Sequence, residues 1–177
     1  MPPTRYHLHS RFLLTSDRDS VWAALTAVPE WPSWWRWAKR IDVLTPPTGE
    51  DGLGAVYRSR VATPLVYGMS YDTAIVDVVR PRLIDVTASG DIAGKGRFLL
   101  SDEPSGGTRV TFTWLVVTPK WWMNLLAPVA RPGFVWNHGR LMTDFGRGLA
   151  KASGGELVEV ENTVLAPKDA GFYQMPA

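Results

Sequence analysis

The chain has 177 residues and a mass of 19.7 kDa, with 45% hydrophobic and 20% charged residues. This composition fits one globular domain better than collagen, coiled coil or intrinsic disorder. Lys and Arg outnumber Asp and Glu by only 19 to 17, so the charge gives no support to nucleic-acid binding. Because the chain has no cysteine, disulfides, thiolate nucleophiles and cysteine-ligated zinc are excluded as well.

The sequence offers no targeting or membrane-spanning signal. Its start, MPPTRYHLHSRF, lacks the apolar core of a secretory signal, and the most apolar stretch, residues 121–130, is too short to span a bilayer. We therefore expect a cytoplasmic protein, a monomer or homodimer, that makes at most transient contact with a membrane. The histidines, His7, His9 and His138, do not form a metal-binding pattern, and we expect neither a metal nor a cofactor.

The first predicted elements are a strand and two short helices. Residues 6–15 alternate loosely between apolar and polar side chains, which is typical of a strand. Apolar residues spaced along 21–28 then predict a helix that ends at Pro29. A second short helix is expected to begin near Pro32, within the segment WPSWWRW, which holds four of the nine tryptophans.

The middle of the chain is predicted to form consecutive antiparallel strands. Runs rich in Val, Ile, Thr and Tyr are separated by Pro- and Gly-rich turns, and no helix-length segment divides them, which argues against parallel βαβ units. We expect strands near residues 41–44, 55–61, 66–79, 83–89, 96–101 and 108–117. Because successive side chains alternate between the faces of a strand, this region places a row of aromatic side chains on one face.

The pattern after residue 119 becomes helical. Pro128 and Pro132 are expected to break or kink the helix, which leaves a long helix over residues 133–151. One stripe of this helix is apolar except for His138. Residues 152–177 are predicted to be a tail appended to a domain of residues 1–151.

These elements predict an α+β fold, in which a curved seven-stranded antiparallel sheet wraps around the long C-terminal helix and two short helices follow strand 1. Several short motifs occur in a fixed order: VWAAL, EWPSWW, VVRPRLI, SGDIAGKGRFLL, GGTRVTFTW and NHGRLM. In this order they resemble the START-like, or SRPBCC, superfamily, which includes the birch pollen allergen, lipid-transfer domains and polyketide cyclase/dehydrase proteins. The resemblance covers about residues 5–151. It implies a helix-grip fold with a ligand cavity between the long helix and the sheet, and it does not imply one chemistry.

A small hydrophobic or amphipathic molecule, such as a lipid, an isoprenoid or a polyketide, is the partner that such a cavity predicts. One helix rarely fills a curved sheet, and an incompletely filled concavity lined by aromatic side chains is a usual small-molecule site. The expected ligand contacts are Trp34, Trp35, Tyr57, Met69, Tyr71, Phe112, Trp114, Asn137, Leu141 and Met142. The two tryptophans are expected at the entrance, although plain packing of a short helix would explain them equally well.

His138 is the candidate catalytic residue. The alternative function is a polyketide cyclase or dehydratase that uses His138 as general acid or base, because imidazole titrates near neutral pH. Two other interpretations stay open: a ligand contact, and a neutral core histidine bonded to a backbone carbonyl or a tyrosine hydroxyl. No inward-facing Asp, Glu or Arg accompanies His138 on the predicted strands.

Overall fold

The computed structural model describes residues 5–64, 68–117 and 121–164, apart from the side chains of residue 5 and residues 121–131. The chain begins with strand β1 (Arg5–Leu14), helix α1 (Arg18–Thr26) and the short helix α2 (Trp31–Trp34). Six strands follow: β2 (Ala38–Thr45), β3 (Val56–Ala62), β4 (Gly68–Val79), β5 (Leu83–Gly90), β6 (Ala93–Asp102) and β7 (Thr108–Val117). The long helix α3 (Trp121–Ala152) and strand β8 (Leu157–Val164) complete the described chain.

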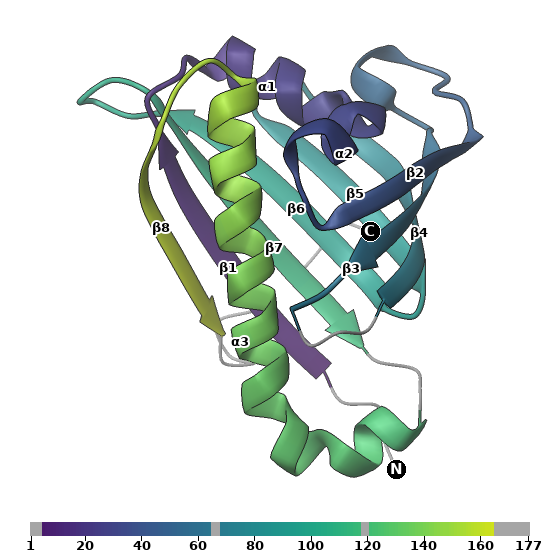
Figure 1. Ribbon diagram of the computed structural model, residues 1–177. Coiled ribbons are helices and arrows are strands. Elements are labelled where there is room, and N and C mark those ends of the chain that lie inside the picture. Colours follow the sequence, from purple (N-terminus) through teal and green to yellow (C-terminus); the bar gives the residue numbers. More distant parts are fainter. Residues whose placement is uncertain (1–4, 65–67, 118–120, 165–177) are drawn as a thin grey trace, which may run out of the picture.

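All the strands form one antiparallel sheet in the order β2-β3-β4-β5-β6-β7-β1-β8. Figure 1 shows that this sheet is curved, that α3 lies across its concave side, and that α1 and α2 sit near one end of α3. The α+β helix-grip architecture predicted from the sequence is therefore confirmed. The sheet has eight strands rather than the seven expected.

The additional strand, β8, comes from the segment that the sequence analysis treated as a tail. It pairs antiparallel with β1, so that Val160 lies opposite Phe12 and Val164 lies opposite Leu8. Gly154, at φ +79°, takes a left-handed conformation in the turn that returns the chain from α3. The sheet thus extends past residue 151, the expected end of the domain.

The prolines at 128 and 132 were expected to break or kink the long helix, and they do not break it, since it is continuous from Trp121 to Ala152. In Figure 1 its first turns run at an angle to the rest, so the helix bends in its first half instead of ending there. A proline removes one backbone hydrogen bond and pushes the preceding turn aside, which is enough to bend a helix.

The core lies between the concave face of the sheet and the second half of α3. Its most deeply buried large side chains include Leu8, Phe12, Leu14, Trp22, Leu25, Phe145 and Leu149. Gly146 allows α3 to lie directly on β1, because a Cβ atom there would be 2.6 Å from a ring carbon of Phe12. A glycine inside a helix costs roughly 0.5–1 kcal/mol relative to alanine, so this close approach is gained at the expense of helix propensity.

Two glycines of α3 make a matched test of this close approach. Gly146→Ala should lower the free energy of unfolding by about 1–2 kcal/mol, since overpacking against a buried ring outweighs the gain in helix propensity. Gly139→Ala should raise it by roughly 0.5–1 kcal/mol, because the nearest atom to a Cβ there is 3.6 Å away. Urea unfolding followed by circular dichroism measures both, and stabilisation by both substitutions would refute the described seating of α3.

Candidate ligand-binding cavity

A cavity of about 120 Å³ lies between the concave face of the sheet and α3. Strands β3 to β7 supply one wall, and one stripe of α3 supplies the opposite wall. The end of α1 and the α2 segment contribute further lining residues, among them Leu25, Val28 and Trp31. The predicted space between the sheet and the long helix is therefore present and is not filled by side chains.

Most of the predicted contact residues line this cavity. They are Trp35, Tyr57, Met69, Tyr71, Phe112, Trp114, Leu141 and Met142, and the candidate catalytic residue His138 lines it as well. The structure brings these side chains together from β3, β4, β7, α3 and the segment after α2. Inward alternation along the strands and the 3.6-residue repeat of α3 are what place them on the same space.

Trp34 and Asn137 are not among the described lining residues. Trp34 packs on α3, with its ring centroid 5.3 Å from that of Phe145. Its place in the lining is taken by Trp31, which lies one helical turn before Trp35 and shares its face. Asn137 is buried, with 2% of its surface exposed, but it precedes His138 by one position and so points about 100° away from it.

Aromatic rings form much of the cavity wall. Phe98 stacks on Phe112 with centroids 4.2 Å apart, and Phe112 lies 5.3 Å from Trp114. From α3, Phe145 makes an edge contact with Trp35 at 5.2 Å. Phe98 and Phe145 also line the cavity but were not predicted as contacts, although Phe145 lies two turns after His138 on the same stripe.

The position of the Trp114 indole depends on the neighbouring strand. Gly96 pairs with Trp114 across β6 and β7. A Cβ atom at Gly96 would be 2.5 Å from two ring carbons of Trp114. Glycine at this position therefore lets the indole lie over β6, and any side chain would displace it.

His138 presents an unpaired nitrogen. Its Nε2 is out of contact with solvent, and no partner for it exists within the described residues, although part of the side chain remains exposed. Burial lowers the pKa of His138 from 6.5 to about 4, so the imidazole is neutral at neutral pH. Within the described residues, neither the carbonyl nor the tyrosine partner considered for a core histidine is found at this atom.

The remaining polar groups of the lining are uncharged too. Among the described residues, those that line the cavity include no Asp, Glu, Lys or Arg. Burial raises the pKa of Tyr71 to about 12 and also raises the pKa of Tyr57, which keeps both phenols protonated. The cavity therefore offers hydroxyl and imidazole hydrogen bonds but no charge.

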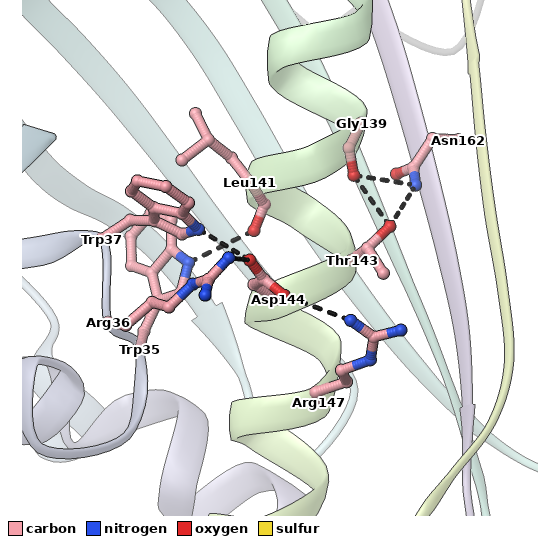
Figure 2. A network of polar contacts seen from close by, with 9 residues as sticks. All are labelled: Trp35, Arg36, Trp37, Gly139, Leu141, Thr143, Asp144, Arg147 and Asn162. Atoms are coloured by element: carbon pink, nitrogen blue, oxygen red, sulfur yellow. Dashed lines mark hydrogen bonds and ion pairs between the residues drawn. The ribbon is translucent and has the colours of Figure 1, made fainter. Parts of the chain in front are cut away.

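Hydrogen bonds hold α3 to the segment that connects α2 with β2, as Figure 2 shows. Asp144 accepts one bond from Trp37 Nε1 at 2.8 Å and another from Arg36 at 2.6 Å, while Trp35 Nε1 donates to the Leu141 carbonyl at 3.2 Å. Burial alone would raise the pKa of Asp144, but the bonds from Trp37 and Arg36 outweigh it and keep the pKa below its ordinary value. The carboxylate thus stays ionised and bonded.

The opposite side of α3 is held to β8 (Figure 2). Asn162 donates from Nδ2 to the Gly139 carbonyl at 3.3 Å and to Thr143 Oγ1 at 3.2 Å. Its Oδ1 accepts a bond from Ser10 Oγ of β1 at 2.7 Å. The stretch of α3 that carries His138 and Leu141 is therefore fixed on both sides.

Acidification should reveal the burial of His138. Below pH 6.5 this histidine takes up a proton in the unfolded chain, whereas in the folded chain it does so only near pH 4. The free energy of unfolding therefore decreases as the pH falls from 6.5 to 4. Between pH 7 and pH 5 the loss from this residue is about 2 kcal/mol. In His138→Gln, the decrease in unfolding free energy over this interval should be smaller by that amount.

Urea unfolding at the two pH values measures the difference between parent and variant. His9, whose pKa burial also lowers, is present in both proteins, so its contribution cancels. Equal pH dependence of the two proteins would mean that the His138 imidazole reaches water in the folded state.

No group of three or more His, Asp or Glu side chains is placed to hold a metal ion in the described parts of the chain. None of the helices, as far as the structure describes them, combines the length and apolar character needed to cross a membrane.

Comparison with known proteins places the fold. No family model and no curated protein sequence matches the chain. Among solved structures, the di-domain ARO/CYC BexL superposes on 86% of this chain with a TM-score of 0.68 and 13% identity, and this chain spans only 51% of it. The Zhui aromatase/cyclase from a Streptomyces species matches at TM-score 0.67 and 15% identity over 85% of this chain and 94% of that protein.

A START superfamily protein from Mycobacterium smegmatis matches at TM-score 0.64 and 17% identity, over 82% of this chain and 95% of that protein. Identities this low are evidence for a common fold. Together with the curved sheet, the long helix and the cavity between them, these similarities show that the chain has a START-like, or SRPBCC, fold.

Proposed function

We propose that the protein binds a small hydrophobic or amphipathic molecule in the cavity between the sheet and α3. The observation that carries this proposal is the cavity itself, which is bordered by aromatic and aliphatic side chains with a few uncharged polar groups. This combination of an apolar wall and a small number of polar atoms is usual in sites for small molecules. The fold of the neighbouring structures, which include aromatase/cyclases and a START protein, is consistent with it.

The volume of the cavity limits the size of the molecule that can bind without movement of the lining side chains. A cavity of about 120 Å³ is similar to the engineered cavity of about 150 Å³ in another protein that binds benzene. Sites for drug-sized molecules measure roughly 300–1,000 Å³. A single ring therefore fits the cavity as it stands, while a lipid, isoprenoid or polyketide chain requires lining side chains to move apart.

Catalysis by His138 is the second candidate, supported by the position of this residue in the lining. With a pKa of about 4, only about one imidazole in a thousand is protonated at pH 7, which leaves little general acid. The same low pKa makes the neutral imidazole a weak base, and catalytic groups work best with a pKa near the working pH. We therefore favour binding over a cyclase or dehydratase reaction.

Ligand binding can be tested by filling the cavity. Toluene should raise the melting temperature of the parent protein in proportion to its occupancy, since a ligand that binds only the folded state stabilises it by about 2.7 kcal/mol at 100 times its Kd. Leu141→Trp should abolish this shift, because the indole would occupy the space beside α3. The matched control is Trp136→Leu, at a side chain that is 58% exposed and outside the described lining, and it should keep the shift.

Circular dichroism should confirm that both variants are folded before the shifts are compared. A toluene shift that survives Leu141→Trp, or no shift in the parent protein, would contradict binding in this cavity.

A further inference from the structure

We propose that Phe145 is the residue that limits the size of the ligand, and that it restricts the cavity to molecules with a single ring. The inference rests on the proposed function and specifies its ligand class together with the side chain that sets it. It combines the place of the Phe145 ring beside the cavity, the tryptophan that lies on this ring outside the cavity, and the hydrogen bonds that hold the neighbouring indoles.

The ring of Phe145 lies at the boundary of the cavity. Phe145 is one of the lining residues on α3, and only 2% of its surface is exposed. Its ring centroid is 5.2 Å from that of Trp31 and 5.2 Å from that of Trp35, and both of these tryptophans line the cavity. From the sheet, Phe98 approaches the same ring at 6.1 Å and also belongs to the lining. The ring therefore fills the space where α3, the α2 segment and the sheet meet.

A further tryptophan packs on Phe145 without reaching the cavity. Trp34 is not among the described lining residues, and its ring centroid is 5.3 Å from that of Phe145. Gly148 permits this approach, because a Cβ atom there would be 2.5 Å from the Trp34 carbonyl oxygen. Phe145 thus lies between the cavity and the ring of Trp34.

The indoles that line the cavity beside Phe145 are held in place. Trp31 Nε1 donates a hydrogen bond to the Leu25 carbonyl at 3.1 Å. Trp35 Nε1 donates in the same way to the Leu141 carbonyl at 3.2 Å (Figure 2). A large-to-small substitution leaves a void where the surrounding side chains cannot collapse into the vacated space. Loss of the Phe145 ring should therefore enlarge the cavity instead of closing it.

These contacts determine which molecules the parent protein accepts. The cavity of about 120 Å³ has room for one ring as it stands. A second, fused ring would have to displace Phe145, and neighbouring rings on α2 and the sheet already pack against this side chain. Forcing extra volume into a close-packed interior is unfavourable. The ligand class is therefore single-ring compounds, and Phe145 is what excludes fused ones.

Toluene and naphthalene test this limit, because they differ by one fused ring. In isothermal titration calorimetry at pH 7, the parent protein should bind naphthalene at least about 10-fold more weakly than toluene. In Phe145→Ala, naphthalene should bind at least about 10-fold more tightly than it binds the parent protein, while the affinity for toluene should stay within about 3-fold. Phe145→Leu removes less volume and perturbs stability less, and it should improve naphthalene binding by a smaller factor.

Leu149→Ala is the matched control. Leu149 lies one turn after Phe145 on α3, is fully buried and is outside the described lining. Its truncation also creates a void in the core, but the ring of Phe145 still closes the cavity. The ratio of the two affinities should stay within about 3-fold of the parent value. Circular dichroism should show that each variant is folded before the affinities are compared.

NMR of the indole groups shows where the ligand lies. In Phe145→Ala or Phe145→Leu, naphthalene should shift the indole signals of Trp34. In the parent protein, toluene should leave these signals almost unchanged, because Trp34 is outside the described lining.

The results separate the inference from the proposed function. If toluene binds the parent protein but naphthalene binds it equally well, the inference is wrong and the proposed function stands. The same holds if neither substitution of Phe145 improves naphthalene binding, or if Leu149→Ala improves it as much. If neither toluene nor naphthalene binds any of these proteins, both fall together.

Discussion

The seating of α3 on the concave sheet is the constraint on which the cavity depends. Near its C-terminal end the helix lies directly on β1, because Gly146 leaves room for the ring of Phe12. One turn or more earlier, His138 and Leu141 face open space instead of a strand side chain. Hydrogen bonds of Asp144 on one side of the helix and of Asn162 on the other hold α3 in this position.

This arrangement leaves the interior less stable than it could be. At about 24 cal/mol per Å³, a void of about 120 Å³ costs about 3 kcal/mol relative to a filled core. The unpaired Nε2 of His138 adds roughly 1–3 kcal/mol. Natural proteins depart from tight, satisfied packing mainly at functional sites, and here the residue with the unpaired nitrogen is also one of those that line the void.

The sequence predicted the inward face of the sheet well, because a period of two residues is unambiguous on strands as long as β4 and β7. Trp34 is not among the described lining residues, because its ring packs on Phe145 of α3, and a periodicity cannot distinguish such packing from a place in the lining. The strand β8 was missed for another reason. Val158, Val160 and Val164 supply a local strand signal, but the partner strand is at the opposite end of the chain. The size of the cavity depends on close approaches such as that of Trp114 to Gly96, which no periodicity reports.

The pairing of β1 also has a consequence for biosynthesis. Although β1 precedes the other described elements in the sequence, it lies between β7 and β8, and its side-chain bonds join residues 104 and 152 positions apart. Contacts between such distant residues slow folding, because the chain must close a long loop before any of them forms. On the ribosome, β1 therefore has no strand partner until β7 has been made about 100 residues later, and its second edge is covered only after α3 and β8 have followed.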